Sequence, residues 1–150
     1  MKVYIGCDQK GVECKEKIIN YLKSNDIKVY DTLKKNEEYD DYPDFAVEVC
    51  QSVLNCKENA LGILICNTGI GMSIVANKID GIYCARIVNE NEAFLAKDHN
   101  GANVIAISAM LPMEKIEKIV DTFIATKFPT EERHLRRINK VKAVEKKNAN

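Results

Sequence analysis

Residues 61–73 read LGILICNTGIGMS, an almost unbroken apolar run that ends in a turn containing two glycines. Continuous apolarity is typical of a strand that is covered on both faces, as in a parallel sheet. Glycine allows the sharp backbone turn that must follow such a strand. The residues from Ile70 to Lys78 then have the character of a short helix. This stretch predicts a buried parallel strand, a tight loop beginning at Cys66, and a helix.

Similar units flank this stretch on both sides. The other β-prone runs are 3–7, 27–30, 82–88 and 103–107. Helical patterns cover 12–22, 43–54, 91–98, 112–123 and a last segment for which Thr130 is the expected N-cap. Strands that alternate with helices predict right-handed crossovers. We expect one α/β domain over residues 1–150, a doubly wound, Rossmann-like five-stranded parallel sheet with helices on both faces. The polar residues 141–150 are expected to fray.

Composition excludes several classes of function. The chain has 22 basic and 22 acidic side chains, so its net charge is zero, whereas binding to nucleic acid or an anionic membrane needs a basic surface. No apolar stretch approaches the length of a membrane span. The six cysteines form no C-x-x-C pair, and the spacing of metal ligands is absent. With no signal peptide recognised and no metal-ligand spacing, the sequence predicts a cytoplasmic protein with reduced thiols and no metal site.

The ends of the predicted strands indicate where a ligand would bind. In doubly wound folds, ligands bind beyond the carboxyl ends of the strands. Four places should therefore face one crevice: Asp8 and Gln9 after the first strand, the loop 66–73, Asn89, and residues 108–110.

The loop itself allows three interpretations. Dinucleotide binding is weakly indicated, because the third glycine of the fingerprint is replaced by Ile74. A phosphatase-like loop needs an arginine six residues after the cysteine, and that position is Met72. A thiolate base beside an oxyanion cradle fits, because Gly69 and Gly71 let backbone N–H groups turn inward at a helix start. The residues alone leave this third interpretation and an inert structural turn equally open.

Five motifs together resemble one family. Cys66-x-Thr68-Gly69-x-Gly71-x-Ser73, followed by Ala76-Asn77-Lys78, resembles the ribose-5-phosphate isomerase B family, whose relatives include galactose-6-phosphate and allose-6-phosphate isomerases. The other motifs, in family order, are Gly6-Cys7-Asp8, Asp41-Tyr42-Pro43, His99-Asn100 with Ala102-Asn103-Val104, and Arg133-His134 with Arg137. The resemblance covers nearly the whole chain.

The resemblance implies an aldose–ketose isomerase of the pentose phosphate pathway that converts ribose 5-phosphate to ribulose 5-phosphate. The reaction would pass through a cis-enediolate, without metal or cofactor, with Cys66 as the base and His99 as the acid that opens the sugar ring. A homodimer or homotetramer with shared active sites is implied, with the C-terminal helix reaching the partner. The implied substrate-binding residues are Asp8, Gln9, Tyr42, Asn67, Thr68, Gly69, Ile70, Gly71, Asn100, Arg133 and Arg137, of which 67–71 offer N–H groups to the enediolate, Asp8 and Asn100 bind hydroxyls, and the two arginines hold the phosphate.

Three positions depart from the family pattern. Gln9 stands where the family usually has histidine, Met110 where it has arginine, and Asn67 where it has glycine. The first two changes remove cations that could bind a phosphate, although neighbours such as Arg86 or Arg136 could compensate. A six-carbon sugar phosphate as substrate, or a non-catalytic partner subunit that binds sugar phosphates, therefore remains the alternative.

Overall fold

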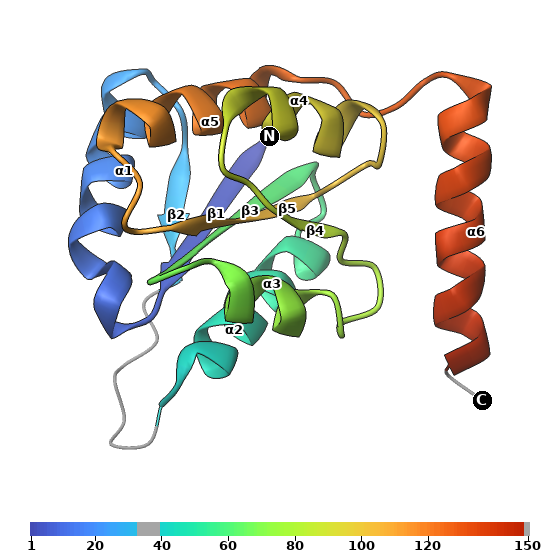
Figure 1. Cartoon of the computed structure of the whole chain (residues 1–150), viewed down its shortest axis with the longest axis horizontal. Helices are drawn as coiled ribbons and strands as arrows, with labels where there is room; N and C mark the ends of the chain where they lie inside the picture. The colour runs from blue at the N-terminus through green and yellow to red at the C-terminus, as the bar shows by residue number, and fades with distance from the viewer. Residues whose placement is uncertain (33–39, 149–150) are drawn as a thin grey trace.

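The computed structural model describes residues 1–32 and 40–148 and forms one parallel sheet with helices around it (Figure 1). The strands are β1 (Lys2–Cys7), β2 (Val29–Asp31), β3 (Ala60–Cys66), β4 (Cys84–Arg86) and β5 (Val104–Ser108). The helices are α1 (Val12–Ser24), α2 (Tyr42–Asn55), α3 (Ile70–Ala76), α4 (Glu90–Asp98), α5 (Met113–Ala125) and α6 (Glu132–Asn148), with a 3₁₀ turn, η1 (Gln9–Gly11).

The strand order is β2-β1-β3-β5-β4, and every neighbouring pair is parallel. The strand predicted from the apolar run, β3, lies at the centre between β1 and β5. Because both of its edges are paired and both of its faces are covered, every residue from Leu61 to Cys66 is buried. The predicted doubly wound α/β fold is confirmed.

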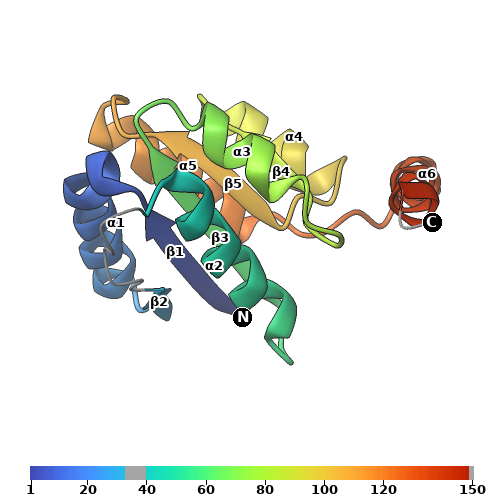
Figure 2. The same ribbon diagram turned by 90° about the horizontal axis from the view of Figure 1, so that it is seen from below.

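Two layers of helices enclose the sheet (Figures 1 and 2). Helices α1, α4 and α5 pack on one face, and α2 and α3 pack on the other. Alternate residues of β3 serve the two cores, since Ile63 and Ile65 face the first group while Leu64 and Cys66 face the second. In both views α6 stands apart from these layers, beyond the β4 edge.

Several element boundaries differ from the predictions. Strand β4 is shorter than the predicted 82–88, because the N–H groups of Tyr83 and Cys84 bond to asparagine side chains, those of Asn103 and Asn77, instead of to a strand. Strand β2 begins two residues later than expected, at Val29.

Two further differences concern α3 and α6. Helix α3 ends at Ala76, short of the predicted Lys78. Helix α6 begins at Glu132. The carbonyl of Glu131 accepts the first helical hydrogen bonds, from the N–H groups of His134 and Leu135, so Thr130 is not the N-cap. Its final turns do not fray before Asn148, since Glu145 accepts bonds from Gly81 N–H (3.1 Å) and the Tyr83 hydroxyl (3.3 Å). Over the described residues, no helix is long and apolar enough to cross a membrane.

The buried Lys97 ties the end of α4 to the end of α5. Its Nζ donates to the carbonyls of Phe123 (2.8 Å) and Ile124 (3.3 Å), which the last turn of α5 leaves without helical partners. The rings of Phe123 and Phe128 lie 5.2 and 5.1 Å from the ammonium. Burial lowers the pKa of Lys97 to about 8. This contact fixes the turn that leads into His99.

The lowered pKa predicts a pH-dependent stability difference between the protein and a Lys97→Met variant. Between the folded pKa of about 8 and the ordinary value of 10.5, the unfolded chain binds more protons, so the contribution of Lys97 to stability rises with pH. From pH 7 to pH 10, the unfolding free energy of the wild type should gain about 2–3 kcal/mol relative to Lys97→Met. Urea denaturation at each pH measures this. The exposed Lys118→Met is the control, and parallel curves for wild type and Lys97→Met would contradict the prediction.

Candidate active site

Cys66 is the last residue of β3 and marks the carboxyl edge of the sheet. It is 6% exposed, it pairs with Ser108 of β5, and its carbonyl accepts a bond from Ala109 N–H at 2.8 Å. Its Sγ accepts a hydrogen bond from Gly69 N–H at 3.0 Å. A backbone donor aimed at the sulfur favours the negative thiolate over the neutral thiol. The sulfur is therefore placed where a base could act.

The backbone of the loop is held by its own side chains and by neighbours. The Thr68 hydroxyl accepts a bond from Ile70 N–H at 3.2 Å, so its place in this structure is at the start of α3. Ser108 Oγ donates to the Asn67 carbonyl at 2.6 Å, and Arg86 Nε donates to the Thr68 carbonyl at 2.9 Å. These bonds immobilise the peptides whose N–H groups were predicted to bind an enediolate.

Gly69 adopts a left-handed conformation, with φ of 77°. A Cβ at this position would lie 3.1 Å from the backbone carbonyl carbon of Ile107, which cannot move without disrupting β5. Glycine is required here both by its φ and by its close approach to the neighbouring strand.

Asp8 and Gln9 lie at the same edge of the sheet. The Asp8 carboxylate caps η1, and Oδ1 accepts bonds from Lys10 N–H (3.0 Å) and Gly11 N–H (3.2 Å). Asp8 N–H donates to the carbonyl of Ile65, next to the catalytic candidate. Asp8 thus has a structural role, and its predicted contact with a sugar hydroxyl stays a prediction. Gln9 is exposed within η1.

Tyr42 lies against the start of α3 from the first residue of α2. A Cβ added to Gly71 would come within 2.7 Å of the Tyr42 ring, so the ring lies directly against this glycine. The tyrosine remains 42% exposed. An aromatic ring therefore lies next to the loop, and its contact with a substrate stays a prediction.

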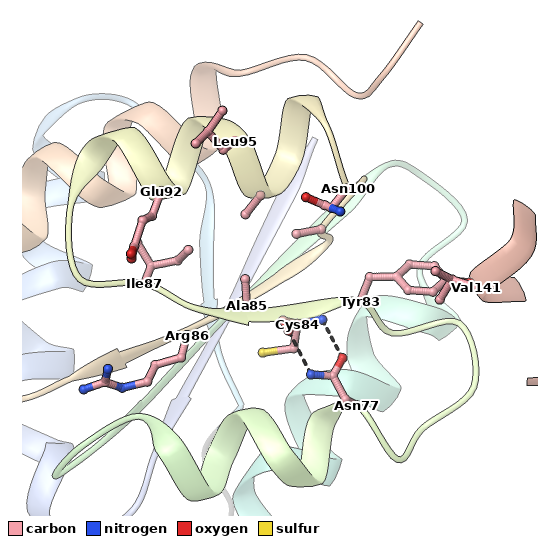
Figure 3. A pocket seen from close by; sticks show the side chains of 12 residues that line it. Asn77, Tyr83, Cys84, Ala85, Arg86, Ile87, Glu92, Leu95, Asn100 and Val141 are labelled. Carbon is pink, nitrogen blue, oxygen red and sulfur yellow. Dashed lines mark hydrogen bonds between the residues drawn. The ribbon is translucent and has the colours of Figure 1, made fainter. Parts of the chain in front are cut away.

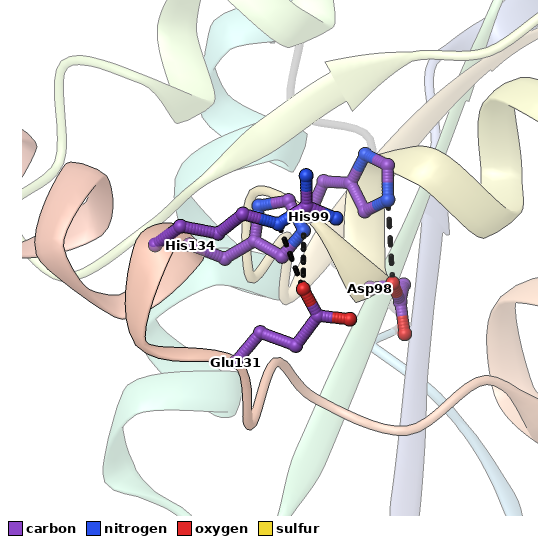
Figure 4. A network of polar contacts seen from close by, with 5 residues as sticks. Asp98, His99, Glu131 and His134 are labelled. Carbon is purple, nitrogen blue, oxygen red and sulfur yellow. Dashed lines mark hydrogen bonds and ion pairs between the residues drawn. The ribbon is translucent and has the colours of Figure 1, made fainter.

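A second group of candidate residues consists of His99, Asn100, Arg133 and Arg137. His99 follows α4, and its ring stacks on that of His134 in α6, with centroids 4.2 Å apart and planes 17° apart. His99 Nε2 lies 3.5 Å from Asp98 Oδ2, and His134 Nε2 lies 3.9 Å from Glu131 Oε2 (Figure 4). Burial, reinforced by the nearby His99 and Arg133, lowers the pKa of His134.

The two arginines extend this second group along α6. Arg133 and Arg137 are exposed and one helical turn apart, so they share a face of the helix. Arg133 Nε donates to Glu131 Oε2 at 2.7 Å.

Within one chain, the two groups lie at opposite ends of the strands, the first at the carboxyl ends and the second at the amino ends. Cys66 pairs with Ser108, the last residue of β5, whereas His99 and Asn100 precede Val104, the first residue of that strand. Five strand residues span roughly 15 Å. Helix α6 likewise contacts segments that precede β4 and β5, at Gly81 and Gly101. One chain therefore brings together Asp8, Gln9, Tyr42 and 66–71, but not His99 and the arginines.

A cavity of about 450 Å³ lies beside β4, and Cys66 is not among its lining residues (Figure 3). Its walls include Arg86 of β4, Asn100 after α4, and Val141 of α6. The Asn77 side chain closes part of this region by pairing with both backbone groups of Cys84, at 2.8 and 2.9 Å. The cavity thus belongs to the outer edge of the sheet, next to the second group of candidate residues.

A metal fits this second group poorly. Asp98, His99 and His134 offer donor atoms within 4.8 Å of one another. A metal ion lies in the plane of each imidazole that binds it, and the nearly parallel rings of His99 and His134 do not direct their lone pairs to one point. We therefore propose no metal-dependent step at this cluster.

Sequence reasoning missed several contacts. The role of Ser108 in holding Asn67, the bond from Arg86 to Thr68, and the stack of His99 on His134 join residues from 18 to 41 positions apart. No local pattern encodes such pairs. Only the polar residues that follow the predicted strands, Ser108 among them, indicated from the sequence that a site lies at the carboxyl ends of the strands.

Comparisons with known proteins agree on one family. Residues 3–141 match the family described as Ribose/Galactose Isomerase. A probable ribose-5-phosphate isomerase B from Mycoplasma pneumoniae is 39% identical over 147 residues, which are 96% of this chain and 95% of that protein.

Solved structures agree as well. Ribose-5-phosphate isomerase B from Clostridium thermocellum has a TM-score of 0.89 and 36% identity, covering 99% of both chains. The Mycoplasma genitalium enzyme, solved with bound ribulose-5-phosphate, has a TM-score of 0.88 and 38% identity, covering 97% of this chain and 96% of that one. The fold, the Cys66 loop and these likenesses converge, and the chain belongs to the ribose/galactose isomerase family.

Proposed function

We propose that this protein interconverts ribose 5-phosphate and ribulose 5-phosphate, with Cys66 as the base and without a metal ion. Family membership and relatives named ribose-5-phosphate isomerase B support the substrate, as does the ligand of the Mycoplasma genitalium structure. The observation that carries the assignment of the base is the position of the Cys66 sulfur, at the end of the central strand and 3.0 Å from Gly69 N–H.

The chemistry is a proton transfer between adjacent carbons. The Cys66 thiolate removes the proton from C2 of the open-chain aldose, and the freed electron pair forms the C1–C2 double bond as O1 becomes negative. The proton returns to C1, and the proton of the C2 hydroxyl moves to O1, which yields the ketose. Because Gly69 N–H already points at the sulfur, we assign the enediolate oxygens to other N–H groups of the loop, that of Gly71 among them.

The remaining groups come from a second copy of the chain. Cys66 and His99 lie at opposite ends of the strands, so one chain cannot bring a base and a ring-opening acid to the same sugar. Helix α6 projects beyond the sheet edge (Figure 1). It carries Arg133 and Arg137 on one exposed face. In a homodimer or homotetramer, α6 can bring both arginines to the partner subunit's Cys66, and the end of α4 can bring His99 and Asn100. Two guanidiniums suit a phosphate dianion.

A mixed dimer tests the shared site. Cys66→Ala and His99→Ala chains, co-expressed with different tags and purified through both, should have about half of wild-type activity, although each variant alone is inactive. The mixed dimer holds one site with both lesions and one intact site. Isomerisation of ribose 5-phosphate by the doubly tagged protein is the measurement.

A matched pair of lesions controls for nonspecific rescue. Cys66 and Asp8 lie at the same end of the strands in one chain, so each site of a mixed Cys66→Ala and Asp8→Ala dimer carries one lesion. The activity of this dimer should not exceed that of the Asp8→Ala homodimer. Recovery in this control, or no recovery in the Cys66/His99 pair, would contradict a site shared between chains.

The substrate assignment is tested by direct assay of three sugar phosphates in the presence of a chelator. Turnover of ribose 5-phosphate supports the proposal, while turnover of only allose 6-phosphate or galactose 6-phosphate would move the assignment to six-carbon substrates. Inactivity on all three would indicate a non-catalytic subunit that binds sugar phosphates. We place the reaction in the cytoplasm, because a thiolate base must stay reduced.

A further inference from the structure

Arg86 reaches the catalytic loop from the edge of the sheet. It is the last residue of β4, and its exposed side chain extends away from the Asn77–Cys84 pair (Figure 3). Its Nε donates a hydrogen bond to the carbonyl oxygen of Thr68 at 2.9 Å. A charged donor on a backbone carbonyl makes a stronger hydrogen bond than a neutral one does.

The carbonyl that Arg86 binds shares a peptide group with the donor to the sulfur. Thr68 C=O and Gly69 N–H belong to the same peptide unit, which is trans. In a trans peptide the C=O and the N–H point in opposite directions. The N–H of this unit points at Cys66 Sγ, 3.0 Å away. The guanidinium, the peptide and the sulfur therefore form one chain of hydrogen bonds.

Such a chain favours the negative form of the sulfur in two ways. A cation on the carbonyl oxygen polarises the peptide, which makes its N–H a better donor. The same bond also restrains the rotation of the peptide, which is adjacent to the left-handed Gly69. Both effects act on the thiolate more than on the thiol, because a charged acceptor gains more from a donor.

We propose that Arg86 is a positioning residue, which holds the Thr68–Gly69 peptide so that its N–H stabilises the Cys66 thiolate. The proposal rests on the role of Cys66 as the base. It also gives this arginine a task other than the replacement of phosphate-binding cations at positions 9 and 110.

The test compares Arg86→Met with Arg86→Lys. At neutral pH, alkylation of Cys66 by iodoacetamide, followed by mass spectrometry of its peptide, should slow on the order of three- to tenfold in Arg86→Met. Arg86→Lys keeps the charge and should recover part of the rate. In turnover of ribose 5-phosphate, kcat should fall by a similar factor, while KM changes less than about twofold.

Two controls isolate the effect. Lys118→Met removes a positive charge from the exposed face of α5 and should leave alkylation of Cys66 unchanged. Alkylation of the half-buried Cys14, read from the same digest, reports whether the variant is folded.

Two outcomes would overturn the proposal. One is an unchanged alkylation rate of Cys66 in folded Arg86→Met. The other is a raised KM with unchanged kcat, which would make Arg86 a substrate-binding residue. Slowed alkylation in a protein that isomerises no sugar phosphate would support the role of Arg86 and reject the proposed function, so the two failures are distinguishable.

Discussion

Cys66→Ala is expected to lower kcat for isomerisation of ribose 5-phosphate by on the order of 10²–10⁴-fold, which is the usual contribution of a general base. In the proposed reaction the sulfur at the end of β3 is the proton acceptor, and alanine removes it without placing a larger side chain in the surrounding core. Stability should change little, because the lost group is small. Steady-state kinetics and urea denaturation of the same preparations separate the two effects.

A neighbouring cysteine provides the matched control. Cys7 ends β1 at the same edge of the sheet and is also 6% exposed, but burial raises its pKa to about 11, so it remains a neutral thiol near pH 7. Cys7→Ala should therefore keep turnover within a few-fold of wild type. Cys66→Ser should be nearly as inactive as Cys66→Ala, because a hydroxyl is a much weaker acid than a thiol. Full activity in either Cys66 variant would reject the assignment of the base.

Gly69→Ala should damage both the fold and the reaction. A left-handed conformation costs a non-glycine residue about 1–2 kcal/mol. The added Cβ also meets the backbone of β5 at 3.1 Å, and that backbone has no room to yield. The loop must move instead, which withdraws the Gly69 N–H from Cys66. We expect a loss of about 2–4 kcal/mol in unfolding free energy and a fall in kcat of about 100-fold.

Gly81→Ala separates strain from catalysis. Gly81 also has a positive φ, 86°, but its Cβ would meet only the end of the Leu54 side chain, at 3.0 Å. This variant should lose stability from the backbone conformation alone while the folded enzyme keeps its kcat. Denaturation curves and kinetics on both glycine variants decide the matter, and equal kcat values for the two would contradict a special role for Gly69.

Some elements were predictable because their signals are local. The apolar run of β3 predicted a strand buried on both faces, and alternating strands and helices predicted the parallel sheet. Edge elements were predicted less well, since their limits depend on distant partners. Strand β4 begins late because the side chains of Asn103 and Asn77 accept hydrogen bonds from the N–H groups of Tyr83 and Cys84. Helix α6 persists because Glu145 anchors it.

By itself, the sequence determined the fold class and the loop at which a thiolate could act, because hydrophobic periodicity and glycine conformation are properties of short segments. The tertiary structure decided which polar groups meet. It brought Arg86 to the carbonyl of the Thr68–Gly69 peptide, whose N–H faces Cys66, and it stacked His99 on His134 at the opposite ends of the strands. Those pairings depend on strand order and on the direction of each crossover, which bring together residues that no spacing along the chain relates.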